Sequence, residues 1–314
     1  PSSELSREQL ENIDCLICHA SGYNRNLYEN EDGSLEWKPI LWKNQAGLDS
    51  VSKRITMPKR TSCLRCHSGS GGGPNFKRGD IEYELAETDR TYDVHMGTDG
   101  GDMACTDCHG GSNHRMQGRG VDLMGSDSEG RLSCADGACH EAAPHAKELI
   151  NRHAAKVDCT VCHIPTFAKT DATDMVRDWS TPGYSEAKDK HIPTFTMGKD
   201  VVPEIDWYNG TVWAQLPGVP ITVGEDGLVP MVVPQGSKDD PEAKLFAFKV
   251  HKGRMPVLTE DRWLLPINVE EFFADGDIDG AVREAAHVLY GIEDIEYEWV
   301  DVKRYMGIYH GVEP

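Results

Sequence analysis

All ten cysteines of this chain fall into five pairs, and a histidine directly follows the second cysteine of every pair. In four pairs two residues separate the cysteines, and in the remaining pair four residues separate them. The cysteines are Cys15 and Cys18, Cys63 and Cys66, Cys105 and Cys108, Cys134 and Cys139, and Cys159 and Cys162; the histidines that follow are His19, His67, His109, His140 and His163. Because this pattern uses every cysteine, it limits which cofactors or cross-links the cysteines can serve.

The Cys-x-x-Cys-His spacing is the attachment pattern of c-type haem. Its two thiols form thioethers to the porphyrin, and the adjacent histidine then lies under the iron as its first axial ligand. The longer loop between Cys134 and Cys139 still reaches both vinyl groups. Zinc sites and disulfide frameworks use paired cysteines too, but neither needs a histidine after every pair. The sequence therefore predicts five covalently bound haem c groups with their iron.

The positions of the motifs divide the chain in two. Residues 1–163 hold all five, which leaves about 30 residues per haem, too few to surround each haem with its own polypeptide core. We therefore predict a multihaem cytochrome c that is mostly irregular, with short α-helices around a core of packed haems. Residues 164–314 have no cysteine and are expected to wrap this core and contribute distal ligands rather than to form a large independent sheet.

Within these two regions, local patterns predict three regular elements. Residues 144–156 open with a proline in the first turn of an expected helix. Residues 219–233 have apolar residues on both sides of Glu225-Asp226-Gly227, which predicts a β-hairpin that turns at these three residues. Residues 280–290 have the spacing of a short amphipathic helix.

Charge and composition exclude some classes of partner. The net charge is −20, with 52 acidic against 32 basic residues, which disfavours nucleic acid and anionic lipid as partners. No apolar stretch approaches the length of a membrane span. The chain begins at Pro1 rather than Met, and covalent haem attachment takes place outside the cytoplasm. We therefore expect an exported protein whose leader has been removed, located in the periplasm, at the cell surface or outside the cell.

Several segments resemble a known family. They are DCLICH, CLRCHSGSGGGPNFKRGD, YDVHMG, CTDCHGGSNH, NRHAAKVDCTVCHIPTFAK, RDWSTPG and FKVHKGRMPVL. In these segments the chain resembles the octahaem tetrathionate reductase-like cytochromes, although it has five haem-binding motifs in place of eight. The resemblance implies that the packing of the haems is shared.

Eight histidines lie outside the motifs and are candidates for the second axial position. Imidazole is the usual second ligand of haems that carry electrons. His114 and His145 each follow a motif histidine by five residues, too short a tether to reach the far face of the same haem, so we expect them to ligate neighbouring haems. We expect His191 and His287 to be structural. The predicted second ligands are His95, His114, His145, His153, His251 and His310.

Two further candidate sites rest on other residues. In the family that this chain resembles, a lysine shortly after the second motif ligates the catalytic iron, and the resemblance places Lys77 in that role. The alternative is an exposed surface lysine. The carboxylates of Asp275, Asp277 and Asp279 alternate like the start of a calcium loop, but the glutamate that closes such a loop is missing. An acidic turn is the competing interpretation.

These features lead to two hypotheses of function. In the first, all five haems are six-coordinate and pass electrons to redox partner proteins or to an extracellular acceptor. A variant of it is a homopolymer in which His310 ligates a haem of the next subunit, since open head-to-tail contacts produce filaments. In the second, a haem with Lys77 as a displaceable ligand reduces a small oxyanion or related compound such as tetrathionate, nitrite or hydroxylamine.

Overall fold

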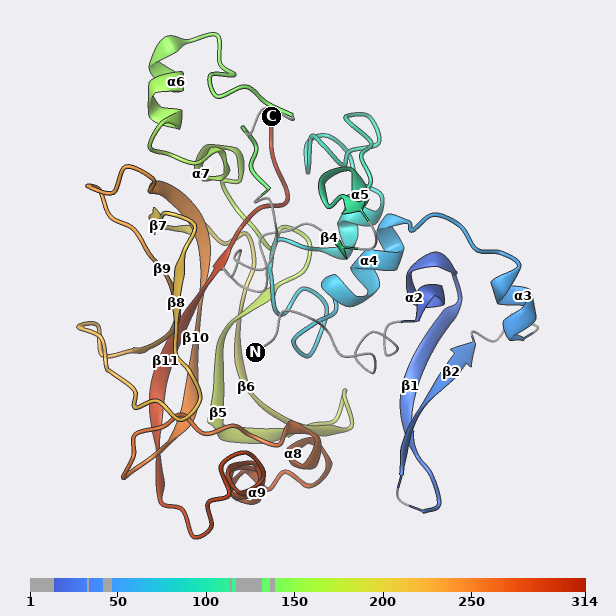
Figure 1. Ribbon diagram of the computed structural model, residues 1–314, viewed down its shortest axis with the longest axis vertical. Helices are drawn as coiled ribbons and strands as arrows, with labels where there is room; N and C mark the ends of the chain where they lie inside the picture. The colour runs from blue at the N-terminus through green and yellow to red at the C-terminus, as the bar shows by residue number, and fades with distance from the viewer. Residues whose placement is uncertain (1–13, 33, 42–46, 113–114, 117–131, 136–138) are drawn as a thin grey trace.

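The chain changes character after its fifth haem-binding motif. The computed structural model describes residues 14–32, 34–41, 47–112, 115–116, 132–135 and 139–314. Short helices, turns and loops make up the described residues up to 163, whereas a large sheet dominates those that follow (Figure 1). Among the described residues, no helix is both long enough and apolar enough to cross a membrane.

Four of the five motifs lie on helices of one or two turns. These helices are α2 (Cys15–His19), α4 (Arg60–His67), α5 (Cys105–Cys108) and α7 (Cys159–His163). At the start of α2 the Asp14 carboxylate accepts a hydrogen bond from the backbone N–H of Leu16, and Asp158 does the same for Thr160 in α7. Such N-caps satisfy backbone donors that a short helix leaves unpaired. Of the fourth motif the structure describes Cys134, Ala135, Cys139 and His140, and the His140 N–H donates to the Cys134 carbonyl (3.2 Å).

The other elements before residue 163 are small. They are the hairpin of β1 (Tyr23–Glu29) and β2 (Leu35–Leu41), α3 (Leu48–Ser52), the 3₁₀ turn η1 (Tyr83–Ala86), the two-residue strands β3 (Gly111–Ser112) and β4 (Arg115–Met116), and α6 (Glu148–Ala154). Of the thirty buried hydrophobic residues in the described part of the chain, only six precede residue 164. So small a polypeptide core is what we expect where packed haems supply the rest.

The helix predicted at residues 144–156 is present but shorter. Helix α6 covers only Glu148–Ala154. The Asn151 side chain explains the late start, because it accepts from the His145 N–H (2.9 Å) and donates to the His145 carbonyl (2.7 Å). This side chain therefore holds the preceding residues in a turn outside the helix.

After residue 163 the chain forms a seven-stranded sheet. Its path is β6-β5-β10-β11-β9-β8, and β7 pairs with one end of β10. Strands β5/β10 and β11/β9 run parallel, and the other pairs run antiparallel. The strands are β5 (Thr173–Ser185), β6 (Lys190–Gly198), β7 (Glu204–Tyr208), β8 (Val212–Ala214), β9 (Val229–Pro234), β10 (Lys244–Leu258) and β11 (Tyr297–Gly307).

Two sequence predictions for this region are wrong. We expected residues 164–314 to wrap the haem core without forming a large sheet, yet the long strands β5, β10 and β11 build one. The hairpin at 219–233 is also absent: a turn forms at Gly224, but the first arm is not a strand. The Ile221 N–H donates to the Arg262 carbonyl (2.8 Å) instead of pairing with β9, and Ile221 still packs on Val229 and Val257.

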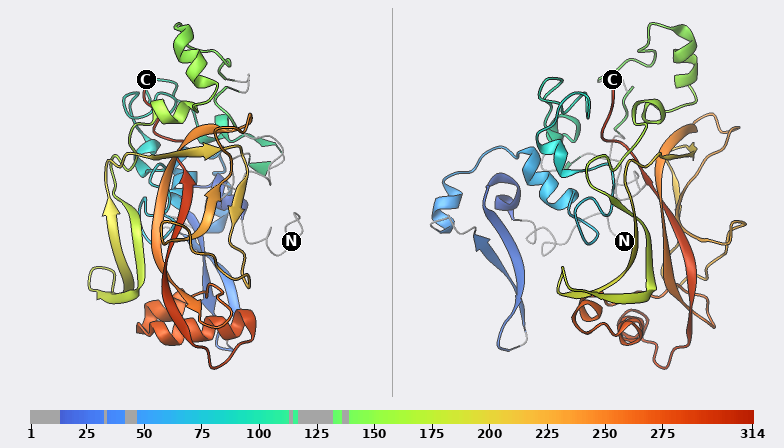
Figure 2. Two further views of the ribbon diagram at one scale, coloured as in Figure 1. Left: turned by 90° about the vertical axis from the view of Figure 1, so that its left-hand side faces the viewer. Right: turned by 180° about the vertical axis from the view of Figure 1, so that it is seen from behind.

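Two helices pack together at one end of the sheet (Figures 1 and 2). Helix α8 (Val269–Asp275) and helix α9 (Ile278–Tyr290) bury Phe272 and Ala281 against Trp179 of β5. The helix predicted at residues 280–290 is thereby confirmed, and it begins at Ile278 because the Asp277 side chain caps it.

The C-terminal residues join the sheet to the haem-binding region. Ile308 is fully buried in one cluster with Ile164 and Phe167, which directly follow the fifth motif. Further along, the Val94 N–H donates to the Val312 carbonyl (2.8 Å), and the Glu313 N–H donates to the His163 carbonyl (2.7 Å). The tail therefore links the sheet to residue 94 and to the fifth motif.

Candidate haem-binding sites

Successive motifs lie beside one another in the order of the sequence. The Cys63 thiol hydrogen-bonds to Cys105 and lowers the pKa of Cys105 to about 7. In the same way, a hydrogen bond from Cys134 lowers the pKa of Cys159 to about 6. The second motif thus contacts the third, and the fourth contacts the fifth.

The remaining neighbours are linked by weaker contacts. Burial raises the pKa of Cys18, and the nearby thiols of Cys63 and Cys66 raise it further. Burial also raises the pKa of Cys108, and the nearby Cys139 thiol raises it further. The Arg65 guanidinium also ties the first two motifs together by donating to the carbonyls of Ile17 (2.6 Å) and Tyr23 (2.7 Å). All five motifs therefore form one unbroken series.

Three motif histidines each face a histidine from outside the motifs. His140 lies opposite His95 with 6.0 Å between ring centroids, at an interplanar angle of 70°. His109 lies opposite His310, and His163 lies opposite His145, both at 6.1 Å, with interplanar angles of 27° and 13°. Every His–His ring contact in the described part of the chain pairs a motif histidine with one of the predicted second ligands.

This spacing fits an iron between the rings. An imidazole nitrogen binds a metal at about 2 Å, and the ring centroid lies about 1 Å behind that nitrogen, so two imidazoles on opposite sides of one iron have centroids about 6 Å apart. The residues present therefore fit bis-histidine haem at the third, fourth and fifth motifs.

Hydrogen bonds to Nδ1 orient several of these rings. Nδ1 lies 2.9 Å from the Thr56 carbonyl in His19 and 3.0 Å from the Glu313 carbonyl in His163. In His145 it lies 3.2 Å from Asn151 Oδ1, and in His310 it lies 3.0 Å from Asp80 Oδ2. A histidine that donates through Nδ1 keeps the lone pair of Nε2 for a metal.

Asp80 is the centre of a buried polar group at the His310 site. The Arg78 guanidinium and His310 hold the pKa of Asp80 well below its usual range, against the opposing effect of its complete burial. Its Oδ2 also accepts from the Tyr309 N–H (2.9 Å). His67, the histidine of the second motif, lies close by: burial lowers its pKa, and the charges of His310 and Arg78 lower it further.

The structure does not bring every predicted ligand to a motif. His251 lies on β10 with Nε2, rather than Nδ1, directed at a carboxylate, Asp174 Oδ2, 3.2 Å away. His153 is exposed on α6, and no ring contact pairs it with a motif histidine among the described residues. His114 lies outside the described residues. His191 packs between Tyr184 and Gly276, as a structural histidine does.

His310 lies opposite His109 of its own chain. The ring is fixed there through Asp80, whose side chain is fully buried. Ligation of a haem in the next subunit by His310 stays a prediction.

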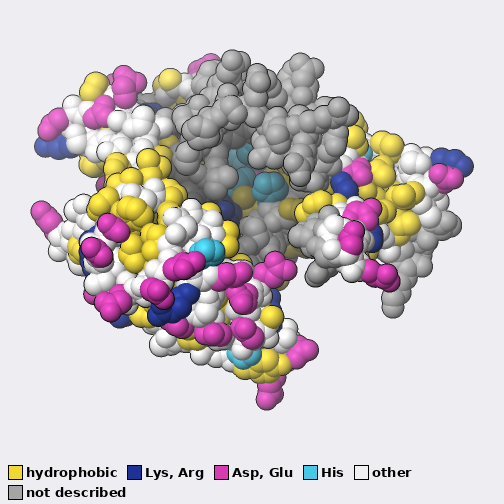
Figure 3. Space-filling model, turned by 60° about the horizontal axis from the view of Figure 1, so that its bottom comes forward, with side chains coloured by type: hydrophobic (Ala, Val, Ile, Leu, Met, Phe, Trp, Pro, Cys, Tyr) yellow, Lys and Arg dark blue, Asp and Glu magenta, His cyan; other side chains and the backbone are white. Residues whose placement is uncertain are grey.

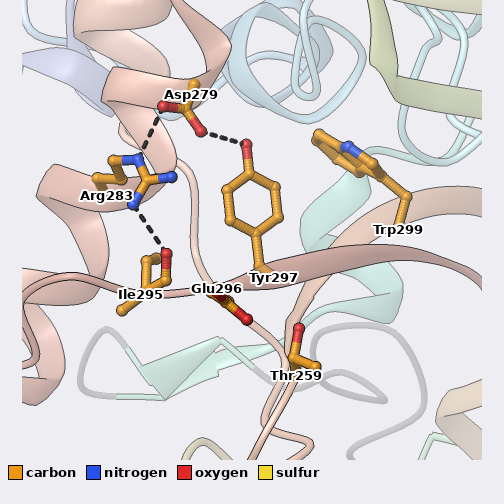
Figure 4. A pocket seen from close by; sticks show the side chains of 7 residues that line it. All are labelled: Thr259, Asp279, Arg283, Ile295, Glu296, Tyr297 and Trp299. Atoms are coloured by element: carbon orange, nitrogen blue, oxygen red, sulfur yellow. Dashed lines mark hydrogen bonds and ion pairs between the residues drawn. The ribbon is translucent and has the colours of Figure 1, made fainter.

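The three aspartates of the expected calcium loop have other partners. Asp277 caps α9 by accepting from the Gly280 N–H (3.0 Å), and Asp275 accepts from the Asp277 N–H (2.8 Å). Asp279 pairs with Arg283 (2.7 Å) and accepts from the Tyr297 hydroxyl (2.9 Å), on the wall of a surface cavity of about 470 Å³ (Figure 4).

The described residues also contain no cluster of three or more carboxylate, histidine or cysteine side chains placed to hold a metal ion. The acidic-turn interpretation fits this arrangement better than the calcium site does. Acidic side chains are common on the face of the molecule seen in Figure 3.

One residue that the sequence analysis missed is Lys249. It lies two residues before His251 on β10 and is fully buried, with Nζ donating to the carbonyls of Phe76 (2.9 Å) and Lys77 (3.0 Å) and to Thr173 Oγ1 (2.6 Å). Burial lowers its pKa to about 7, and the charge of Asp174 opposes this shift. Only its position in the FKVHKG segment could have indicated it.

Comparisons with known proteins indicate the class of protein to which this chain belongs. Residues 174–314 match the family model "Cytochrome c bacterial". The crystal structure of octaheme cytochrome c from Shewanella oneidensis superposes with a TM-score of 0.77 and 28% identity, covering 96% of this chain and 70% of that one. This chain is a multihaem c-type cytochrome that resembles the octahaem cytochromes. These matches support two general properties of the cytochrome, covalently bound haem c and electron transport.

A second relative covers less of the cytochrome. An uncharacterized protein of Archaeoglobus fulgidus (strain ATCC 49558 / DSM 4304 / JCM 9628 / NBRC 100126 / VC-16) is 36% identical over 144 residues, which are 41% of this chain and 46% of the relative. The cytochrome thus aligns with less than half the length of this relative.

Proposed function

We propose that this cytochrome transfers electrons through five covalently attached haems arranged in the order of their motifs. The observation that carries the proposal is the set of three facing histidine pairs at 6.0–6.1 Å. An iron held by two imidazoles has both axial positions filled, so it exchanges electrons without binding a substrate.

The proposed ligand sets follow from these contacts. The third haem is attached to Cys105 and Cys108 and ligated by His109 and His310. The fourth, on Cys134 and Cys139, has His140 and His95, and the fifth, on Cys159 and Cys162, has His163 and His145. The first and second haems take His19 and His67 as their first ligands.

The contacts between motifs support a continuous path. Cys63 lies beside Cys105, and Cys134 lies beside Cys159. Haems attached to these cysteines would therefore have neighbouring edges, and a series of such haems would let electrons enter at one end and leave at the other. We further propose that the cytochrome is exported, because c-type attachment takes place outside the cytoplasm, and that it serves redox partner proteins or an extracellular acceptor.

Haem content tests this proposal. The intact mass of the purified cytochrome should exceed that of the polypeptide by five haems, and extraction with acid and acetone should leave the colour with the protein. Variant Cys134→Ala/Cys139→Ala should lose one haem and keep four. A wild-type mass with four haems or fewer would exclude the series of five.

A second candidate function is reduction of a small oxyanion at the second motif. In the described part of the chain no ring contact pairs His67 with another histidine, although burial lowers its pKa and His310 and Arg78 are near enough to lower it further. The loop that follows His67 carries Lys77 and Arg78, and Arg177, Lys188 and Lys249 donate to its backbone carbonyls. This local positive charge would attract an anion despite the net charge of −20.

Activity assays distinguish the two functions. The cytochrome, reduced by an electron donor, would be mixed with tetrathionate, nitrite or hydroxylamine, and its reoxidation would be followed by absorbance. A reductase would reoxidise rapidly, and variant Lys77→Ala would lose that rate, whereas Lys53→Ala, an exposed lysine elsewhere, would keep it. Reoxidation no faster than that of a denatured control would exclude the reductase.

A further inference from the structure

Two buried aspartates, Asp80 and Asp93, bind the backbone of the C-terminal tail. Asp80 Oδ2 accepts hydrogen bonds from the N–H groups of Tyr309 (2.9 Å) and His310 (3.3 Å). Asp93 Oδ2 accepts from the N–H groups of the next two residues, 311 and 312 (2.9 Å and 3.2 Å). Consecutive backbone N–H groups are therefore paired with carboxylate oxygens, and the His310 ring is held where it faces the third motif.

The contacts of Asp80 are those of an ionised carboxylate. Its Oδ1 lies 3.3 Å from Nε of Arg78, and its Oδ2 accepts from the two backbone N–H groups. Neither a guanidinium nor a backbone N–H can accept a hydrogen bond, and an arginine beside a carboxyl favours the charged form. Because an ionised carboxylate only accepts, the His310 ring carries the proton on Nδ1 and donates it to Asp80 Oδ2, 3.0 Å away.

The acceptor on Nδ1 distinguishes His310 from three other proposed ligands. In His19 and His163, Nδ1 faces a backbone carbonyl, and in His145 it faces the side-chain amide oxygen of Asn151. Those acceptors are neutral, whereas that of His310 is a carboxylate. A hydrogen bond to an ionised group is roughly twice as strong as one between neutral groups.

A carboxylate on Nδ1 changes what the other ring nitrogen offers to a metal. It draws the Nδ1 proton toward itself, which leaves more negative charge on the ring and raises the basicity of the ligand. Ferric iron has one more positive charge than ferrous iron, so it gains more from such a ligand. Hydrogen bonding to a ligand is one way in which a protein sets the potential of a haem. The Asp80 side chain is fully buried, so water screens its charge little.

We propose that Asp80 is a positioning residue that holds His310 at the third haem and lowers the reduction potential of that haem. The inference rests on the proposed ligation of the third haem by His109 and His310. Arg78 offsets part of the negative charge, but it contacts Oδ1, so Oδ2 remains the acceptor for the ring.

The test compares two pairs of variants of the haem-loaded cytochrome. Asp80→Asn keeps the shape of the side chain and an oxygen acceptor but removes the charge. Arg78→Met/Asp80→Asn removes both charges, so no arginine is left buried without its partner. The matched controls, Asp301→Asn and Arg254→Met/Asp301→Asn, make the same changes in an arginine–aspartate pair at the surface of the sheet.

Redox titrations followed by EPR give the potential of each haem, and the third haem is the component missing from Cys105→Ala/Cys108→Ala. We expect the third haem of Asp80→Asn to stay low-spin and its potential to become more positive. At a fixed applied potential its ferrous-to-ferric ratio should rise by about tenfold, or about 60 mV for one electron, because a charged acceptor is replaced by a neutral one. The double variant should shift in the same direction by less, because the lost charge of Arg78 acts in the opposite sense. Both controls should match the wild type.

Three results would overturn the proposal. One is a third-haem potential in Asp80→Asn equal to that of Asp301→Asn; if the single variant does not fold, the two double variants decide by the same comparison. Another is an equal shift of all haems, which would indicate a general change in the protein. The third is a high-spin third haem in Asp80→Asn, because an amide oxygen in the same place should still hold the ring.

Failure of the proposed function would be seen in other variants. Cys105→Ala/Cys108→Ala would then have the same haem content as the wild type, or His310→Ala would keep all of the low-spin EPR intensity. Either result would show that the third haem is not attached or ligated as proposed, whatever the effect of Asp80.

Discussion

Replacing His145 by alanine tests the axial ligation most directly. The His145 ring lies 6.1 Å from that of His163, nearly parallel to it, and Asn151 orients its Nδ1. Without this imidazole the fifth iron keeps one protein ligand, and its ligand field weakens enough to change it from low spin to high spin. The other facing pairs are built from different residues, so the change should be confined to one haem.

The magnitude follows from the haem count. Loss of one low-spin haem should lower the integrated low-spin EPR intensity by about one fifth if all five haems are six-coordinate, and by about one third if only the three haems with facing histidine pairs are. A high-spin signal of matching intensity should appear. Adding imidazole to the variant should restore the low-spin signal by filling the open position. The matched control is His287→Ala, because His287 is an exposed histidine on α9.

An unchanged low-spin intensity in His145→Ala, or an equal loss in His287→Ala, would refute the assignment of His145 to the fifth haem. A loss much larger than one third would mean that neighbouring haems depend on this ligand as well. In that case the sites would not be independent, and the pairing derived from ring distances would be incomplete.

Three further predictions follow from other contacts. Ile308→Ala should lower the free energy of unfolding by about 2–4 kcal/mol, because Ile308 is fully buried against Ile164 and Phe167. Denaturant titration measures this loss, and Val288→Ala, a substitution at an exposed position, is the control. Burial lowers the pKa of His251 in the folded protein, so the unfolded state binds more protons and stability should decline as pH falls below about 6.5; a His251→Gln variant that keeps the full decline would contradict this. The same variant should retain all low-spin EPR intensity, because His251 Nε2 lies 3.2 Å from Asp174.

The haem-binding motifs could be predicted from the sequence because their chemistry is local. Two cysteines and a histidine on one turn need only a short helix, and α2, α4, α5 and α7 are such helices. The set of second ligands was partly predictable as well, since histidines outside the motifs are few. Which of them faces which motif was not, because the pairing depends on contacts such as that of His310 with Asp80, which lie 230 residues apart.

The large sheet was missed for a related reason. Strand β10 contains His251, Lys252 and Arg254, charged or titratable residues that do not indicate a central strand. They are accommodated because neighbouring strands supply partners: Asp174 of β5 for His251 and Asp301 of β11 for Arg254. Those partners are distant in the sequence, and no local period reveals them.

The C-terminal tail has a consequence for how such a protein matures. Its last residues contact His163, Asp80 and Asp93, which precede them in the chain by 150, 229 and 219 residues. Residues 309–313 are synthesised after all ten cysteines, so these contacts can form only once every haem-binding motif has been made. A chain that terminated before residue 309 would have every motif cysteine but lack His310, and the segments that residues 309–313 contact would be more open to proteases.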